Sequence, residues 1–227
     1  MERKEAIRGA YRMTGGNNFY DGMITCTTLS GKAVCRLVWD MNKAENDDYL
    51  EKALSGIPEN FSGRLLEVPV GTGILTMPVY QTLPEADITC LDYSTDMMGQ
   101  AQEKANRLKL NNVTFQQGDV GALPYEDDTF DIVLSLNGFH AFPDKEAAYR
   151  EVFRVLRPGG TFCGCFYVMG EHKRTDWFVR HVYEKAGFFT PPYETVSSLK
   201  ARLKDAYDEV HVGNLKSIAW FICRKAE

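Results

Sequence analysis

Two glycines and an aspartate have the spacing of a nucleoside-binding site. Gly71 and Gly73 follow an apolar run at residues 64–69, and Asp92 ends the next apolar run, nineteen positions after Gly73. Glycine lets backbone approach a ligand closely, because no Cβ intrudes. A carboxylate about 20 residues after such a turn can bind the hydroxyls of a ribose. The pattern predicts a mononucleotide-binding βαβ unit and a ligand that contains adenosine.

Polar segments also follow the third and fourth apolar runs. Gly118, Asp119 and Val120 come after the third run, where the Asp119 carboxylate could accept from an adenine amino group and a backbone amide could donate to the ring. Leu136 and Asn137 come at the end of the fourth run and could offer backbone carbonyls to a cationic amine. Ligands of open α/β sheets bind beyond the carboxyl ends of the strands, so we expect one shared site.

The elements that must position these residues alternate along the chain. Apolar runs typical of strands lie at 64–69, 87–92, 112–116, 130–136 and 160–166. Helical periodicity appears at 73–83, 95–109 and 144–156. This alternation predicts a doubly wound, mostly parallel α/β sheet with helices on both faces. Two last runs, 207–213 and 216–223, meet at Gly213-Asn214 and predict a hairpin with an antiparallel final strand.

We expect one domain over residues 1–227. Its parts are an N-terminal cap on the substrate side (1–60), a cofactor-binding core (61–166), an insertion or lid (167–195), and a C-terminal helix with a β-hairpin (196–227). The cap contains helix-like stretches at 29–42 and 46–55, and the insertion contains another at 176–187. A long insertion after a strand is typical of lids over active sites.

Composition narrows the class of partner and the compartment. The net charge of -5 gives no electrostatic support for a nucleic-acid partner. No apolar run reaches the roughly 20 residues of a membrane span. The charged N-terminus lacks the apolar core of a signal peptide. The six cysteines form no Cys-x-x-Cys pair, so we expect reduced, buried thiols in a cytoplasmic protein and no metal site. The oligomeric state is left open.

Five ordered segments resemble the class I S-adenosylmethionine-dependent methyltransferases, nearest to the ubiquinone/menaquinone-biosynthesis-like enzymes that act on small molecules. The matching segments are residues 65–73, 91–98, 118–125, 130–135 and 151–160. The resemblance implies a Rossmann-like sheet of seven strands with an antiparallel last strand. It also implies that S-adenosylmethionine is the cofactor and S-adenosylhomocysteine the product.

The resemblance assigns roles residue by residue. The loop from Glu67 through Pro69 and Gly71 to Gly73 would hold the methionine part of the cofactor. Asp92 would hold the ribose, with Tyr93 and Met97 beside it; Asp119 and Val120 would hold the adenine, and the backbone of Leu136 and Asn137 the amine. Pro69 departs from the family, which usually has glycine there. Proline fixes φ near -65° and removes an N–H donor, so it could reshape the methionine pocket.

The predicted reaction is methyl transfer from the sulfonium to a small-molecule acceptor. Alignment and exclusion of water would supply most of the acceleration, and a base is needed only if the acceptor must lose a proton. His140 is the best base candidate by position, and Tyr20, Asp21, Tyr167 and His172 are weaker ones. Aromatic residues beside the site favour an apolar or ring-bearing acceptor, although core packing explains most of them equally well; they are Phe19, Tyr20, Trp39, Phe139, Phe142, Phe166, Tyr167, Trp177 and Phe178.

Two other functions fit part of the pattern. A nicotinamide-dependent oxidoreductase shares the glycine turn and the ribose acid, but the third glycine of the dinucleotide fingerprint is missing after Gly73. A non-catalytic S-adenosylmethionine-binding protein would keep Asp92 and Asp119 and would never release product. Turnover separates the second alternative from an enzyme.

Overall fold

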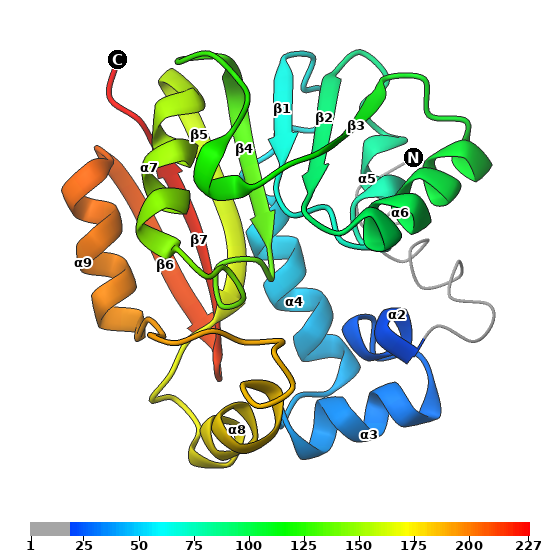
Figure 1. The fold of residues 1–227 in the computed structure, drawn as a ribbon, viewed down its shortest axis with the longest axis vertical. Coiled ribbons are helices and arrows are strands. Elements are labelled where there is room, and N and C mark those ends of the chain that lie inside the picture. Colours follow the sequence, from blue (N-terminus) through cyan, green and yellow to red (C-terminus); the bar gives the residue numbers. More distant parts are fainter. Residues whose placement is uncertain (1–18) are drawn as a thin grey trace.

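The chain folds around one seven-stranded sheet (Figure 1). The structure, a computed structural model, describes residues 19–227. The strands lie in the spatial order β3-β2-β1-β4-β5-β7-β6. Their bounds are β1 (Arg64–Glu67), β2 (Asp87–Asp92), β3 (Val113–Gln117), β4 (Phe130–Leu136), β5 (Leu156–Tyr167), β6 (Glu209–Leu215) and β7 (Ile218–Arg224).

Strand β7 is the antiparallel member of the sheet. It inserts between β5 and β6 and pairs with both in antiparallel register, whereas β1 to β5 pair in parallel. The chain order reverses at β1, beside which β2 and β4 lie on opposite sides. This arrangement confirms the predicted doubly wound sheet with an antiparallel last strand, and it places the switch point where ligands of such sheets bind.

Helices cover both faces of the sheet. Helices α4 (Lys43–Leu54), α5 (Met77–Tyr80) and α6 (Thr95–Leu108) pack on one face, and α7 (Lys145–Val155) and α9 (Val196–Ala206) pack on the other. Each helix buries an apolar stripe, such as Ala148, Val152 and Val155 on α7. Residues buried on both faces explain why the central strands are continuous apolar runs rather than alternating ones.

The remaining helices gather at the carboxyl ends of the strands (Figure 1). Helices α2 (Phe19–Ile24) and α3 (Leu29–Leu37) precede α4, and α8 (Lys173–Phe178) follows β5 and continues as a π-helical turn, Val179–Tyr183. Helix α4 begins at residue 43 because Asn42 and Glu45 form a capping box. None of the helices in residues 19–227 is long and apolar enough to cross a membrane.

The hairpin turn was predicted at the wrong residues. Strand β6 continues through Gly213 and Asn214, and the chain turns at Lys216-Ser217, where Lys216 has a φ of 52°. Gly213 faces the Trp220 ring across the hairpin, and a Cβ there would lie 2.5 Å from a ring carbon. The glycine therefore makes room for an aromatic ring on the neighbouring strand and does not form the turn.

The helix predicted at 73–83 is much shorter than its periodicity indicates. Helix α5 spans Met77–Tyr80. Pro78 is tolerated only in the first turn of a helix, and Pro84 disfavours helical backbone at the residue before it. The two prolines therefore confine this helix, and the residues before it remain a loop at the carboxyl end of β1.

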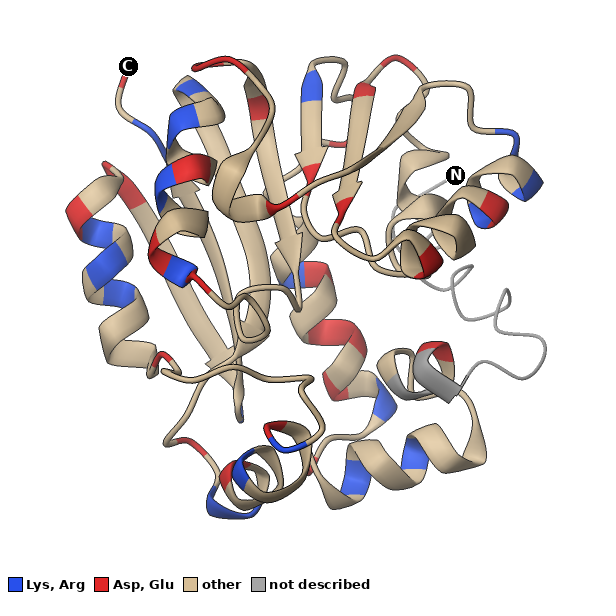
Figure 2. Ribbon diagram, viewed as in Figure 1, with Lys and Arg blue, Asp and Glu red and all other residues tan. Residues whose placement is uncertain are grey.

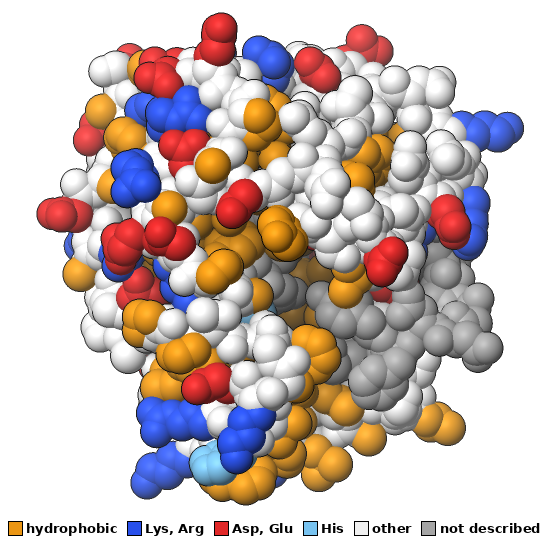
Figure 3. Space-filling model, viewed as in Figure 1, with side chains coloured by type: hydrophobic (Ala, Val, Ile, Leu, Met, Phe, Trp, Pro, Cys, Tyr) orange, Lys and Arg blue, Asp and Glu red, His pale blue; other side chains and the backbone are white. Residues whose placement is uncertain are grey.

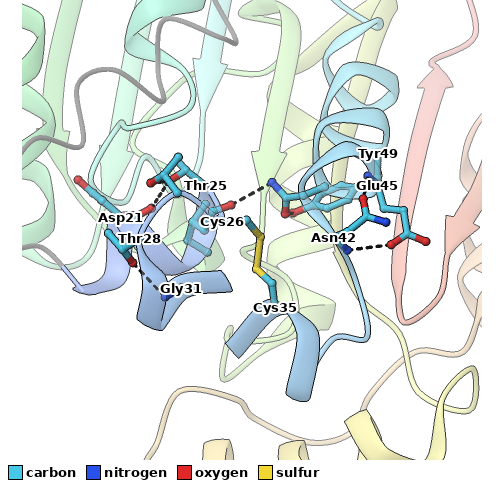
Figure 4. The surroundings of a disulfide bond; sticks show 12 residues. Asp21, Thr25, Cys26, Thr28, Gly31, Cys35, Asn42, Glu45 and Tyr49 are labelled. Atoms are coloured by element: carbon cyan, nitrogen blue, oxygen red, sulfur yellow. Dashed lines mark hydrogen bonds between the residues drawn. A yellow bond between two sulfur atoms is a disulfide. The ribbon is translucent and has the colours of Figure 1, made fainter. Parts of the chain in front are cut away.

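Cys26 and Cys35 form a disulfide, which contradicts the expectation that all six cysteines are reduced (Figure 4). Cys26 follows α2 and Cys35 lies on α3, and the packing of these two short helices brings their Cα atoms to 6.3 Å. The nine-residue separation matches no familiar cysteine motif, so the sequence offered no sign of the pair. The other four cysteines are buried thiols, at positions 90, 163, 165 and 223.

Candidate functional site

The loop after β1 turns through two glycines in left-handed conformation. Gly71 has a φ of 56° and Gly73 a φ of 65°. A Cβ on Gly73 would lie 2.9 Å from the Cβ of Ala101 on α6, so this glycine lets the loop pack against the helix. A Cβ on Gly71 would meet no atom within 4 Å, because Gly71 lines a cavity between this loop and the end of β4. Gly71 thus faces the open space of this cavity, and its contact with a ligand stays a prediction.

Pro69 is accommodated without loss of the turn. The Val68–Pro69 peptide bond is cis. The backbone amides on both sides remain bonded, Val68 N–H to Leu134 O at 2.9 Å and Val70 N–H to Leu91 O at 3.0 Å. Pro69 therefore removes one N–H donor, and Gly71 and Gly73 still form the turn. An effect of Pro69 on the methionine pocket stays a prediction.

Asp92 is buried at the end of β2 and bonded to the glycine loop. Its Oδ2 accepts the Gly71 N–H at 2.7 Å, and its Oδ1 accepts the Ser94 N–H at 2.8 Å. Burial raises the pKa of Asp92, and these backbone hydrogen bonds oppose that shift. Each carboxylate oxygen keeps a second lone pair, so the group can still accept from two ribose hydroxyls. Tyr93 next to it is exposed, and Met97 is half-buried in the first turn of α6.

The segment after β3 forms a short cap rather than a free loop. Asp119 is exposed and its Oδ1 accepts the Gly121 N–H at 2.8 Å, which starts the 3-10 turn Val120–Ala122. Val120 is buried in the core beneath it. The Gly118 N–H donates to Asp92 O at 3.1 Å, so this segment is tied directly to the end of β2. The predicted ribose and adenine residues are therefore adjacent.

Leu136 and Asn137 lie across the cavity from the glycine loop. Both line the cavity, together with Glu67, Pro69 and Gly71. Asn137 has a φ of 55°, and its N–H donates to Cys165 O at 2.7 Å. A Cβ on the next residue, Gly138, would lie 2.4 Å from Cδ of Pro69, so the end of β4 and the glycine loop are in close contact. The structure thus brings residues from the ends of β1 and β4 to one cavity.

Glu67 is a fully buried carboxyl beneath this cavity. Its Oε2 accepts the Tyr80 hydroxyl at 2.8 Å and lies 3.6 Å from the Cys90 Sγ. Burial raises the pKa of Glu67 to about 8, against the opposing effect of the hydrogen bond from Tyr80. The sequence placed Glu67 at the site but gave no sign of its altered acidity, which depends on residues from α5 and β2.

Glu67→Gln is expected to change how stability depends on pH. Between the ordinary pKa of 4.5 and the native value of about 8, the folded chain holds a proton that the unfolded chain has lost. Stability contributed by this group is therefore lost as pH rises through that interval. Glutamine cannot ionise, so the melting temperature of the variant relative to wild type should rise from pH 4.5 to pH 8. Exposed Glu59→Gln is the control, and an unchanged difference would contradict the buried-acid assignment.

A buried ion pair ties the cap to the glycine loop. Asp21 on α2 lies 3.1 Å from the Lys104 Nζ on α6, and its other oxygen accepts the Thr72 hydroxyl at 2.5 Å. Both charged side chains are at least nine-tenths buried. Sequence reasoning proposed Asp21 only as a weak base candidate and missed Lys104 and Thr72. No spacing rule connects residues 21, 72 and 104, so no signal in the sequence marked this contact.

His140 is buried and held by its neighbours. Its ring stacks on Phe189 at 4.0 Å between centroids, and its Nδ1 accepts the Tyr167 N–H at 3.3 Å. Burial and, secondarily, the nearby Lys145 lower the pKa of His140 to about 3. With Nδ1 accepting, the neutral ring carries its proton on Nε2. The neutral His140 ring is therefore a weak base whose Nε2–H can donate a hydrogen bond. A role of His140 as general base stays a prediction.

The other base candidates have structural partners or lie outside the described side chains. The Tyr167 hydroxyl donates to Asp176 at 2.7 Å, and His172 Nδ1 contacts the Thr175 hydroxyl at 3.1 Å. The side chains of Phe19 and Tyr20 lie outside the described residues. Phe139, Phe142 and Phe166 pack in the core beside α7, and Trp177 and Phe178 lie on α8.

Trp39 and Tyr167 belong to one aromatic cluster at the cavity end of the sheet. Trp39 stacks on Tyr183 and Tyr183 stacks on Phe189, with centroids 6.1 and 5.3 Å apart. Tyr167 meets Trp39 and Phe189 edge-on. Three members, Tyr183, Phe189 and Tyr193, were not predicted. They lie in the insertion, where no motif distinguishes a site residue from a core residue.

Comparison with known proteins supports the resemblance. Residues 65–160 match the model of a family described as "Methyltransferase domain". This segment contains Asp92 and Asp119, together with the glycine loop and the end of β4, which line the cavity. Residues 65–160 are therefore similar to a methyltransferase domain.

Relatives of the methyltransferase domain are similar over part of their length. The chain is 32% identical to "2-methyl-6-phytyl-1,4-hydroquinone methyltransferase 2, chloroplastic" of Oryza sativa subsp. japonica over 143 residues. The matched region covers 63% of this chain and 39% of the relative. It is 38% identical over 97 residues to "Demethylmenaquinone methyltransferase" of Thermus thermophilus, covering 43% of this chain and 44% of the relative. The chain therefore spans less than half the length of these curated relatives.

The architecture of the methyltransferase domain also recurs in solved structures. Phosphoethanolamine N-methyltransferase 2 of Haemonchus contortus, crystallised with S-adenosyl-L-methionine, superposes with a TM-score of 0.67 at 16% identity, over 94% of this chain and 61% of the other. At that identity the likeness establishes the shared fold. The predicted family and fold class are thus confirmed by separate comparisons of sequence and of structure.

Proposed function

We propose that this protein is an enzyme that transfers a methyl group from S-adenosylmethionine to a small apolar, ring-bearing acceptor. The observation that carries the proposal is the cavity between the glycine loop and the end of β4, beside which the buried Asp92 carboxylate is fixed by the Gly71 amide. The relatives named as hydroquinone and menaquinone methyltransferases support a quinol-type acceptor. The proposal does not specify whether the methylated atom is carbon, oxygen or nitrogen.

The residues at the cavity fit this cofactor. The open space over Gly71 leaves room for the methionine part, and the Leu136 and Asn137 backbone is available for its ammonium group. Asp92 can accept from the ribose, and Asp119 with the Val120 backbone can bind the adenine. When bound, S-adenosylmethionine supplies a methyl group already activated by its sulfonium. The chain's own residues would bind and orient the reactants and exclude water.

Gly71→Ala is expected to weaken cofactor binding by roughly tenfold or more, because its Cβ would project into the space assigned to the cofactor. Gly187→Ala is the matched control, since Gly187 also has a positive φ, 78°, and open space around its absent Cβ. Both variants should lose about 1 kcal/mol of stability from the left-handed backbone. Equal affinities of the two variants for S-adenosylhomocysteine would rule out Gly71 as the cradle.

We assign the methyl acceptor to the aromatic cluster described above, which includes Trp39, Tyr183 and Phe189. These rings come from the cap and the insertion, the two segments that enclose the cavity end of the sheet (Figure 1). His140 stacks on the same cluster, three residues after Asn137. Its Nε2–H would donate to an acceptor oxygen, because a pKa of about 3 makes the ring a poor base at neutral pH.

The cofactor assignment is tested by calorimetric titration of the purified protein with S-adenosylhomocysteine and, separately, with NAD. We expect micromolar affinity for the former and no measurable heat with NAD. Preference for NAD would instead support the oxidoreductase alternative, which shares the glycine turn and Asp92. If neither ligand binds, the cofactor assignment itself is overturned.

Turnover then separates an enzyme from a binding protein. Incubation with S-adenosylmethionine and a panel of quinols, phenols and aromatic amines should yield S-adenosylhomocysteine with at least one acceptor. A Trp39→Ala variant should keep cofactor affinity and lose turnover, because Trp39 is assigned to the acceptor alone. Tight cofactor binding without product across the panel would favour the non-catalytic alternative.

A further inference from the structure

Exposed apolar side chains concentrate on two adjoining elements. Six large apolar side chains are exposed in the described residues, and Tyr93 beside the cofactor site is one of them. The other five lie on α3 or in residues 177–188: Leu29, Leu37, Trp177, Val182 and Phe188, with exposed fractions of 43% to 89%. Large apolar side chains gathered in this way on a polar surface mark an interaction site. We call residues 29–37 and 173–188 the α3–α8 surface.

Side-chain bonds join the two halves of this surface. The Arg174 guanidinium donates to Arg36 O at 3.1 Å and pairs with Asp40 at 2.9 Å. The Thr175 hydroxyl donates to Val38 O at 2.6 Å in a buried contact. These bonds hold the end of α3 against the start of α8. Figure 3 shows apolar side chains, a histidine and cationic side chains together at this end of the molecule, below the cavity end of the sheet.

The charged groups on the α3–α8 surface are arranged by sign. Five exposed cations lie on it and form no ion pair with another described residue: Lys32, Arg36, Lys173, Arg180 and Lys185. The nearby acids are engaged on the inner side, because Asp176 accepts from Tyr167 and Glu184 accepts from Tyr193. Figure 2 shows the basic segments on α3 and α8. This surface is thus cationic in a chain whose net charge is -5.

We propose that the α3–α8 surface docks on an anionic lipid surface. Exposed Leu, Val, Phe and Trp side chains can enter the interfacial layer of a bilayer, and Lys and Arg around them pair with lipid phosphates. A second copy of this chain fits less well, since contact between two identical surfaces would bring their cations together. A nucleic acid would match the cations but leave four aliphatic and phenyl side chains exposed to water.

Docking through this surface would orient the protein so that an apolar acceptor in the lipid faces the proposed acceptor site. The α3–α8 surface lies at the carboxyl ends of the strands. Two members of the aromatic cluster are close to it in the chain, because Trp39 lies two residues after α3 and Tyr183 ends the π-helical turn that continues α8. Docking would therefore turn the acceptor side of the cavity toward the lipid. The docking itself does not rest on the proposed methyl transfer, so vesicle binding and turnover can fail independently.

The test is co-sedimentation of the full chain with vesicles of phosphatidylcholine alone and of phosphatidylcholine with phosphatidylglycerol. We expect binding to the anionic vesicles, a blue shift of tryptophan fluorescence on binding, and loss of binding as NaCl rises from roughly 0.05 M to 0.5 M. Lys173→Glu/Lys185→Glu should lower the partition coefficient at least tenfold, because each cation near the surface contributes about 1 kcal/mol. Trp177→Ser/Phe188→Ser should lower it similarly.

Lys200→Glu/Lys204→Glu on α9 is the matched control, since it makes the same change in charge at exposed positions on another face. This control should bind vesicles within about twofold of wild type. The proposal is overturned if wild type does not bind anionic vesicles or if the control loses as much binding as the surface variants. It is also overturned if sedimentation shows a dimer that the Trp177/Phe188 variant dissociates.

Discussion

Asp92→Ala is expected to weaken S-adenosylhomocysteine binding by roughly 100-fold or more. Two charge-assisted hydrogen bonds to ribose hydroxyls would be lost, each worth about 1.5–3 kcal/mol. The change also removes the carboxylate that accepts from the Gly71 and Ser94 amides. The glycine loop therefore loses its hydrogen bond to β2, the 2.7 Å contact between Gly71 N and Asp92 Oδ2. Calorimetric titration with S-adenosylhomocysteine measures the effect on samples whose circular dichroism confirms a folded chain.

Asp87→Ala provides the control for Asp92. Asp87 starts the same strand, but its side chain is 65% exposed and its ion-pair partner is Arg64 at 3.8 Å. Exposed pairs of this kind contribute about 0–1 kcal/mol, so this variant should bind like wild type. Asp92→Asn, which keeps one accepting oxygen, should fall between the two. A folded Asp92→Ala protein with wild-type affinity would remove Asp92 from the cofactor site.

Lys104→Met is expected to release the cap and to weaken cofactor binding with it. The variant leaves the buried Asp21 carboxylate without its cation at 3.1 Å, and breaking a buried pair in this way costs about 3–5 kcal/mol. Because Asp21 lies on α2, the cap can open locally and return the carboxylate to water, which limits the loss of stability of the whole fold. We expect faster amide hydrogen exchange in α2 and α3, with the sheet unchanged, and weaker binding of S-adenosylhomocysteine because Ile24 and Thr72 line the cavity.

Two further variants make this result specific. Arg107→Met on the same helix removes an exposed pair with Glu103 at 3.4 Å, and it should alter stability by less than about 0.5 kcal/mol. Asp21→Asn/Lys104→Met removes both charges and should recover part of the lost stability, since no uncompensated charge remains. If Lys104→Met exchanged amides like wild type throughout α2 and α3, the pair would not be what holds the cap.

Sequence reasoning was most accurate where local patterns repeat. The runs at 87–92 and 130–136 became β2 and β4 with the same bounds, because buried parallel strands need continuous apolar residues. It was least accurate where a residue has two uses. Gly213 reads as a turn residue and in fact makes room for Trp220 on the neighbouring strand. The Cys26–Cys35 pair depends on how two short helices pack, which no cysteine spacing encodes.

The sequence alone indicated the methyltransferase resemblance, the doubly wound sheet and the candidate site residues at the strand ends. Those features are local: a glycine turn, an acid at a set spacing and an apolar period each act within one βαβ unit. Tertiary structure alone decided the raised pKa of Glu67, the Asp21–Lys104 pair and the aromatic cluster from the cap and the insertion. These depend on burial and on contacts between residues far apart in the chain, which appear only once the helices are packed on the sheet.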